Sequence, residues 1–163
     1  MIILSIGTNI GDRERNIENA VKALGEVGKV TAISPIYTSE PWGFESENGF
    51  YNIALTMESE LLPLDLLQET QRIEKELGRT AKTTTTYTDR IIDIDLIDYD
   101  NQIIDTPTLT LPHKLMHQRN FVLYPLADIA PKWQHPTLKL SALELKKTSE
   151  DTSTVHIFNT TTD

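Results

Sequence analysis

The sequence predicts an α+β fold, and three observations support this. Four segments of strand length are apolar or alternate between apolar and polar residues, and two longer segments carry apolar residues at helical spacing. These segments follow the order β-α-β-β-α-β, which is the ferredoxin-like order, an antiparallel sheet with both helices on one face. No repeat or linker divides the 163 residues. We therefore expect a single domain over residues 1–163 with a C-terminal extension, in which residues 147–163 are partly flexible.

The N-terminal part predicts a strand, a helix and a second strand. Residues 2–7 form a short apolar run, and Asp12 is suitably placed to cap a helix. Residues 13–24 carry apolar side chains at helical spacing, and Gly25 is placed to end that helix. Residues 29–39 predict a second strand that is bent or interrupted by a proline.

The middle of the chain predicts a loop, a strand and a second helix. Residues 40–49 contain a proline, two glycines and several acids, which favours a loop before a strand at 50–59. Pro63 suits the first turn of the helix, and Gly78 suits its end. The apolar stripe of this helix consists of Leu66, Leu67, Thr70, Ile73 and Leu77.

After the polar, Thr-rich connection at 79–89, residues 90–100 predict the fourth strand. Asp100 and Asn101 indicate a turn, and residues 102–105 can pair back as a short hairpin strand. Residues 110–131 mix loop and helix, and residues 154–158 can form an edge strand.

Composition narrows the class of protein. The formal net charge of −9 argues against a general nucleic-acid binder, which would carry a basic face. The absence of cysteine excludes disulfides and thiolate metal sites, and fits a cytoplasmic enzyme. No apolar run approaches the roughly 20 residues that span a bilayer. The N-terminal apolar burst has no basic leader, so we interpret it as a strand and not as a signal peptide.

Two carboxylates on the fourth strand, Asp93 and Asp95, are unusual for a strand. Because side chains alternate, both point to one face, roughly 6–7 Å apart, and Ile92, Ile94 and Leu96 point to the other. The pair can be two solvated acids on an open sheet face. It can equally hold Mg²⁺, which is commonly bound by one or two carboxylates together with substrate phosphates.

Cationic residues near this strand favour the second interpretation. Each alone can be a surface charge, but together they are the donors that a phosphate-transfer site needs. They are Arg79, Lys82, Arg90, His113, Lys114, His117 and Arg119. Of the other histidines, His135 and His156 have no charged group around them, and we expect both, with His117, on the surface.

In combination, these motifs resemble the 6-hydroxymethyl-7,8-dihydropterin pyrophosphokinase family of folate biosynthesis. The strand "RIIDIDLI" matches the R-x-x-D-x-D strand of the family, and "LPH" and "RNFVLYPL" follow it. Upstream, "SIGTNIGD", "YTSEPWGF" with "FYN", and "TQRIEKELGR" resemble its opening turn, its pterin loop and strand, and its nucleotide helix. The resemblance covers about Ile2 to Pro131.

The resemblance implies an ATP-dependent diphosphotransferase. The hydroxymethyl oxygen of the pterin would attack the β-phosphorus of ATP, and AMP would leave. Asp93 and Asp95 would hold two Mg²⁺ ions and, with Arg79 and Arg90, would be catalytic. The residues implied at ATP are Gln71, Glu74, Arg79, Lys82, Arg90, Leu96, Thr110, His113, Lys114 and Arg119. Those implied at the pterin are Ser39, Trp42, Phe50, Asn52, Tyr87, Asp93 and Phe121.

The loop at residues 79–90 is implied to close over both substrates, although it departs from the family pattern. Tyr87 to Arg90 stand where many members have W-G-P-R, and Lys82 stands in place of an arginine. The small-molecule substrates would be the only partners of a monomer, with no nucleic acid and no membrane. Two other functions stay open: another Mg²⁺-dependent phosphohydrolase or nucleotidyltransferase, and a non-catalytic ferredoxin-like ligand-binding module.

Overall fold

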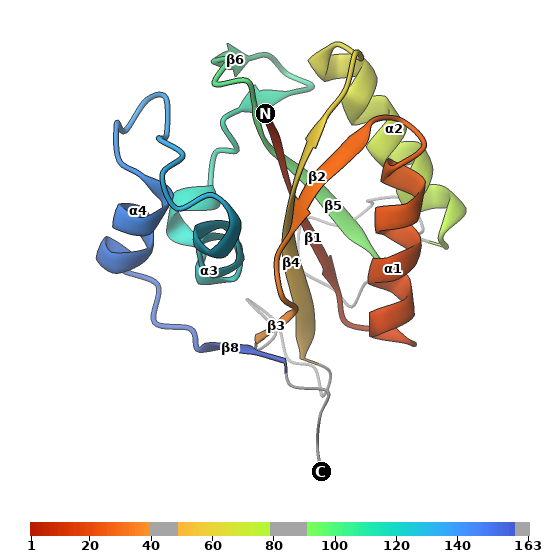
Figure 1. The fold of residues 1–163 in the computed structure, drawn as a ribbon, viewed down its shortest axis with the longest axis horizontal. Coiled ribbons are helices and arrows are strands. Elements are labelled where there is room, and N and C mark those ends of the chain that lie inside the picture. Colours follow the sequence, from red (N-terminus) through yellow and green to blue (C-terminus); the bar gives the residue numbers. More distant parts are fainter. Residues whose placement is uncertain (40–48, 79–90, 159–163) are drawn as a thin grey trace.

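An antiparallel sheet lies between two layers of helices in the computed structural model, which describes residues 1–39, 49–78 and 91–158 (Figure 1). The strands of this sheet are β1 (Ile2–Thr8), β2 (Lys29–Ile33), β3 (Tyr37–Ser39), β4 (Phe50–Glu58), β5 (Asp93–Tyr99) and β8 (Val155–Ile157). Their order is β5-β1-β4-β3-β8, and β2 also pairs with β4. The α+β class with an antiparallel sheet is therefore confirmed.

The first helical layer consists of α1 (Arg13–Leu24) and α2 (Pro63–Glu76), which cover one face of the sheet together. Both helices lie where their apolar spacing predicts. The Asp12 side chain accepts a hydrogen bond from the Arg15 amide at 3.2 Å, so the predicted N-cap is confirmed. Gly25 follows the last turn of α1, and Gly78, with φ of 105°, follows that of α2. The buried stripes of these helices and the inward side chains of β1, β4 and β5 form the larger core.

The second helical layer covers the opposite face and comprises α3 (Asn120–Ile129) and α4 (Ala142–Thr148). A short 3-10 turn (Met116–Gln118) precedes α3. A second core forms here, where Leu123 and Leu126 of α3 pack with Ile3, Ala54 and Ile97 of the sheet. The sequence prediction omitted α4, although Ser141 and Glu144 form a capping box that marks its start.

Strand pairing confirms two expectations and corrects one. The predicted second strand is interrupted as expected and forms β2 and β3, which both pair with β4. The predicted edge strand near the C-terminus is present as β8, which pairs with β3. The expected hairpin on the fourth strand was wrong. Residues of that segment form β6 (Ile104–Asp105), which pairs with β7 (Thr110–Leu111) and not with β5.

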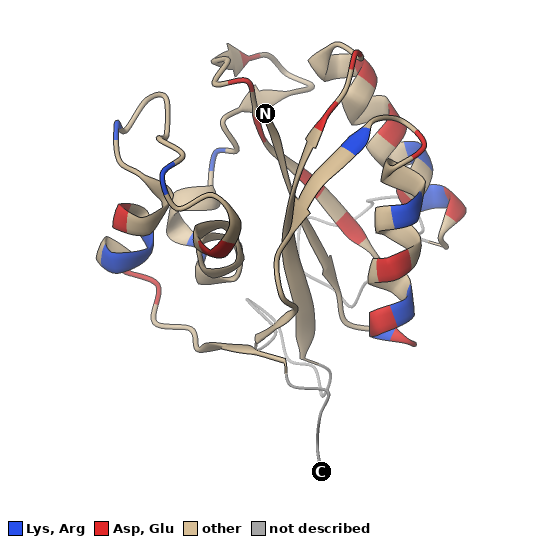
Figure 2. Cartoon of the chain, in the orientation of Figure 1, with Lys and Arg blue, Asp and Glu red and all other residues tan. Residues whose placement is uncertain are grey.

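Charge is distributed unevenly over the elements (Figure 2). Helices α1, α2 and α4 carry several acidic and basic residues, whereas α3 carries only Asp128. Strands β1 and β3 carry no charged residue, and β4 carries only Glu58. Strand β5 is the exception, with three aspartates at one edge of the sheet. Among the described residues, no helix has the length and apolar character needed to cross a membrane.

Candidate active site

The two carboxylates of β5 lie on the sheet face that α3 covers. Ile92, Ile94 and Leu96 are buried in the core beneath α1 and α2, as their alternation predicts. Asp93 and Asp95 therefore point to the other face, and both are partly exposed. On β1, Asp93 lies opposite Gly7 and Asp95 lies opposite Ser5.

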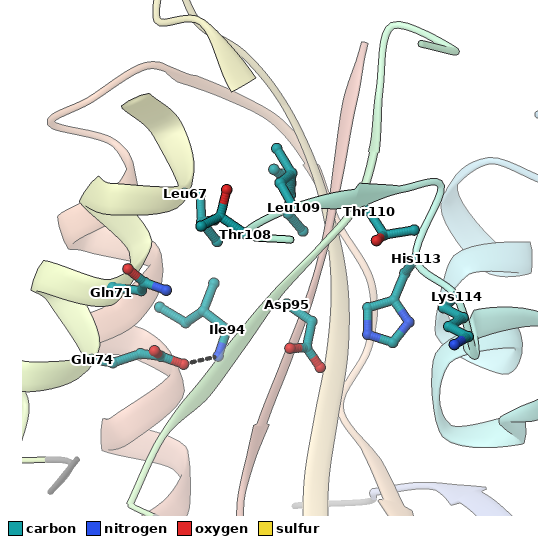
Figure 3. Close-up of a pocket in the computed structure, with 11 residues that line it drawn as sticks. Leu67, Gln71, Glu74, Ile94, Asp95, Thr108, Leu109, Thr110, His113 and Lys114 are labelled. Atoms are coloured by element: carbon teal, nitrogen blue, oxygen red, sulfur yellow. Dashed lines mark hydrogen bonds between the residues drawn. The ribbon is translucent and has the colours of Figure 1, made fainter. Parts of the chain in front are cut away.

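A pocket of about 200 Å³ extends along the outer edge of β5 (Figure 3). Three elements line it: α2, β5 and the segment at residues 108–114. The pocket brings together seven residues implied at the nucleotide or the metal, namely Gln71, Glu74, Asp95, Leu96, Thr110, His113 and Lys114. In Figure 3, Gln71 and Glu74 lie on one side of Asp95, and His113 and Lys114 lie on the other. Sequence motifs far apart in the chain thus meet in one cavity.

Glu74 connects α2 to the edge of β5. Its side chain is buried, with only 4% of its surface exposed, and Oε2 accepts a hydrogen bond from the Ile94 amide at 2.7 Å. Ile94 stands between Asp93 and Asp95, so this bond holds the strand beside both carboxylates. The resemblance implied Glu74 at the nucleotide, and the structure shows its side chain buried at the pocket. A buried carboxylate is stabilised by such a charge-assisted bond.

His113 is held on the same edge of β5. Its backbone amide donates to the Ile97 carbonyl at 2.8 Å. Its Nδ1 accepts from the Leu115 amide at 3.1 Å, which places the proton of the neutral ring on Nε2. The imidazole is therefore arranged as a hydrogen-bond donor beside Asp95 (Figure 3).

A second group of polar residues lies where β3, β4 and β1 meet. Asn52 is buried, with 2% exposed, and its Nδ2 donates to Ser39 Oγ at 2.8 Å. Phe50 shares the face of Asn52 on β4 and lies opposite Ser39 on β3. Gly7 of β1 pairs with Asn52 on one side and with Asp93 on the other. This amide and the carboxylates therefore share one face of the sheet, with a glycine between them.

The absence of a side chain at Gly7 makes room for this amide. A Cβ atom at that position would lie 2.9 Å from Asn52 Oδ1 and 3.7 Å from Phe50 Cδ1. Gly7 lies within a regular strand, so the need for glycine comes from space and not from backbone conformation. Sequence reasoning missed Gly7, Ser5 and the pocket residues Leu67, Thr108 and Leu109, because only strand register and tertiary packing place them here.

Helix α3 carries Phe121 in its first turn, two residues after Arg119. Arg119 is buried, and its guanidinium carbon lies 5.5 Å from the centre of the Phe121 ring. The Tyr37 hydroxyl of β3 donates to the Asp128 carboxylate, which ties α3 to the sheet. Burial, followed by the bond to Asp128, raises the pKa of Tyr37 well above its usual value.

Five residues implied at the site lie outside the described part of the chain: Trp42, Arg79, Lys82, Tyr87 and Arg90. The same holds for the loop at residues 79–90 that was expected to cover the substrates.

The expectation that His135 lies on the surface was wrong. Its side chain is 5% exposed, and its Nδ1 accepts from the amides of Thr137 and Leu138 at 3.1 and 3.0 Å. Burial, with a smaller effect from His117, lowers the pKa of His135. His117 is half-buried against it, with ring centres 6.2 Å apart, and only His156 is exposed as predicted.

Comparison with known proteins agrees with the resemblance. Residues 3–131 match the family model of 7,8-dihydro-6-hydroxymethylpterin-pyrophosphokinase. A 2-amino-4-hydroxy-6-hydroxymethyldihydropteridine pyrophosphokinase of Porphyromonas gingivalis is 45% identical over 139 residues, which are 83% of this chain and 94% of the relative. The enzyme of the same name from Bacillus subtilis is 40% identical over 128 residues, covering 77% and 75% of the two chains.

Solved structures share the fold. The wild-type HPPK-DHPS protein of Plasmodium falciparum, crystallised with pteroate, superimposes with a TM-score of 0.71 at 17% identity. The match covers 90% of this chain but only 41% of the other, so this chain spans less than half of that protein.

Proposed function

Because this chain belongs to the 7,8-dihydro-6-hydroxymethylpterin pyrophosphokinase family, we propose that it transfers a pyrophosphoryl group from ATP to the hydroxymethyl group of 6-hydroxymethyl-7,8-dihydropterin and releases AMP. This is a step of folate biosynthesis. The observation that carries the proposal is the position of Asp93 and Asp95, which lie between the pocket at β5 and the buried Asn52–Ser39 pair. A triphosphate in the pocket and a ring beside Asn52 would meet at these carboxylates.

The donor set at β5 fits Mg²⁺. Two partly exposed carboxylates stand on one sheet face, and the described residues contain no group of three or more acids or histidines arranged around a metal. Mg²⁺ commonly takes only one or two carboxylates and completes its shell with water and substrate phosphates. We assign Asp93 and Asp95 as the ligands of two such ions. When bound, the ions would neutralise the triphosphate charge and align it for in-line transfer.

For the nucleotide, we assign the pocket residues by their chemistry. Gln71 offers an amide to adenine or ribose, and Leu67, Leu96 and Leu109 offer apolar contact. His113 Nε2–H and Lys114 would donate to phosphate oxygens. Thr110 and Glu74 complete the pocket set, and the resemblance adds Arg119, Arg79, Lys82 and Arg90.

For the pterin, we assign Asn52 and Ser39 to the polar edge of the ring. The hydrogen bond between them is buried and fixes the orientation of the amide, which suits the reading of a flat heterocycle. Phe50 and Phe121, from β4 and α3, would stack on the two faces of the ring. Asp93 would lie nearest the hydroxymethyl group, and the resemblance adds Trp42 and Tyr87.

In the proposed reaction, the hydroxymethyl oxygen forms a bond to the β-phosphorus while the bond from that phosphorus to the oxygen of AMP breaks. The side chains orient the two substrates and supply charge, which are the main contributions to phosphoryl transfer. No covalent intermediate with the protein is needed.

The remaining assignments follow from the family and from the order of the strands. We propose that β5, β1, β4 and the pair β2 and β3, with α1 and α2, form the ferredoxin-like unit, to which α3, α4 and β8 are added. We also propose one domain over residues 1–163, a cytoplasmic monomer, and no nucleic-acid or membrane partner. The last part of the end expected to be flexible, residues 159–163, lies outside the described residues.

A product assay tests the function. Purified protein is incubated with ATP, MgCl₂ and 6-hydroxymethyl-7,8-dihydropterin, and the products are separated by chromatography. Equal amounts of AMP and pterin diphosphate are expected, and formation of both should stop when EDTA removes the metal. Formation of ADP or free phosphate instead would indicate a different phosphotransferase or a phosphohydrolase. No turnover by folded protein that binds the pterin would indicate a binding module.

A further inference from the structure

Residues 149–158 form a C-terminal clasp that lies beyond the region matched by the family model. The clasp leaves the end of α4, passes the N-terminus of α3 and ends as β8 beside β3 (Figure 1). It therefore touches two elements that carry residues assigned to the pterin.

At α3, the clasp supplies a cap that the helix lacks locally. Arg119 occupies the N-cap position but makes no side-chain capping bond. Asp151, 31 residues further along the chain, accepts a hydrogen bond from the Asn120 amide on Oδ2 at 2.8 Å. This amide is one of the four that a helix N-terminus leaves without an intrahelical acceptor. The Asn120 side chain also donates to the carbonyls of Asp151 and Ser153 at 3.0 and 3.1 Å.

Asp151 is itself held in place. Its Oδ1 accepts from the Ser153 amide at 2.9 Å, and its own amide donates to Ser149 Oγ at 3.2 Å. Burial by itself would raise the pKa of Asp151, but the hydrogen bonds from Asn120 and Ser153 outweigh burial and lower it. The carboxylate is thus charged at neutral pH and satisfied by amides on both oxygens.

At its other end, the clasp covers the outer edge of β3. Val155 pairs with Ser39 and Ile157 pairs with Tyr37, and the Phe158 amide donates to the Ile36 carbonyl at 2.7 Å. The Phe158 ring lies 4.5 Å from the ring of Tyr51 on β4. Because β3 has only three residues, pairing on both edges is what holds Ser39 against Asn52.

We infer that the clasp positions the pterin side of the active site, with Asp151 as a positioning residue that holds the first turn of α3 at a fixed place relative to β3. The inference rests on the proposed function. Phe121 and Arg119 flank the capped Asn120, and Ser39 lies under β8. In contrast, none of the residues that line the pocket at β5 belongs to α3, β3 or the clasp. The clasp should therefore act mainly on the pterin, and on ATP only through Arg119, which precedes the capped Asn120.

The test is Asp151→Ala in the full-length protein, with Glu150→Ala as the control, because Glu150 is an adjacent but exposed acid. Without the cap, the first turn of α3 frays in part of the molecules. The apparent affinity for the pterin then falls in proportion to the fraction of molecules that can still bind it. We expect the KM for the pterin to rise about three- to tenfold. The KM for ATP, which depends on this turn only through Arg119, should change by a smaller factor. Asp151→Asn keeps one acceptor oxygen and should recover part of the loss, and it serves as the test variant if Asp151→Ala does not fold.

Three outcomes would overturn the inference: an unchanged pterin KM, equal changes in both KM values, and the same effect in Glu150→Ala. Hydrogen exchange separates this result from the fate of the proposed function. The Asn120 amide should exchange faster in Asp151→Ala than in wild type, while amides of α2 stay unchanged. If wild-type protein forms no AMP, the proposed function is wrong, and so is the proposed role of the clasp at the pterin. Unchanged exchange at Asn120 would refute the cap even when AMP is formed.

Discussion

Substitution of Gly7 by alanine tests the role of the Asn52–Ser39 pair beside the carboxylates, because it adds a single methyl group there. The new Cβ atom would lie 2.9 Å from Asn52 Oδ1, closer than such atoms approach in proteins. The Asn52 amide cannot yield freely, since its Nδ2 is bonded to Ser39 Oγ at 2.8 Å in a buried place. Either the amide turns and loses this bond, or the two strands separate.

The magnitude follows from that hydrogen bond. Leaving a buried polar group without its partner costs about 1–3 kcal/mol. If the cost falls on the orientation of the Asn52 amide, which we assign to the pterin, the dissociation constant for the pterin should rise about fivefold to about 150-fold. ATP should bind with nearly unchanged affinity, because Gly7 is not among the residues that line the pocket at β5.

Isothermal titration of the pterin and of an ATP analogue measures both effects, and thermal melting shows that the variant is folded. Gly25→Ala is the matched control, because it adds the same methyl group at the far end of α1, where the nearest atom is a backbone carbonyl at 3.3 Å. Wild-type pterin affinity in a folded Gly7→Ala protein would refute the assignment of Asn52 to the pterin.

Three further predictions concern the metal, the edge of β5 and pH. Asp95→Asn should lower kcat by about a thousandfold or more at saturating Mg²⁺. The melting temperature should change little, because the carboxylate is partly exposed. A kcat within tenfold of wild type in the AMP assay would contradict the proposed role of Asp95 as a metal ligand. Glu74→Ala should lower the free energy of unfolding by about 1.5–3 kcal/mol, because it removes the charge-assisted bond to the Ile94 amide. Urea denaturation measures this change, and an unchanged midpoint would contradict the prediction. The folded-state pKa of His135 is lowered by burial, so the unfolded chain binds more protons as pH falls through about 6.5 and stability is lost below that pH. His135→Asn should therefore lose less of its free energy of unfolding than wild type as the pH falls from 7.5 to 5. Equal slopes of this free energy against pH would show that His135 does not titrate on unfolding. The control is His156→Gln, which changes an exposed residue and should behave as wild type.

Local patterns in the sequence determined much of this protein. The Asp12 cap and the apolar spacing of residues 13–24 predicted α1, because capping bonds and helical period involve only neighbours in the chain. The same holds for β5, where alternation alone separates Asp93 and Asp95 from the buried Ile94. Linear motifs were also enough to suggest the family, since they are read without knowledge of the fold.

Other features were decided only by the tertiary structure. The pairing of β6 with β7, the burial of His135 and the bond from Glu74 to Ile94 each join segments whose contact depends on how whole layers pack. The cap that Asp151 provides for α3 is invisible in the sequence, because donor and acceptor are 31 residues apart and no local spacing relates them. Local sequence patterns indicate which secondary structure a residue favours. Burial and long-range pairing depend instead on which other parts of the fold pack against that residue. For that reason the sequence predicted candidate residues for the site, and the fold decided how those that the structure describes are held.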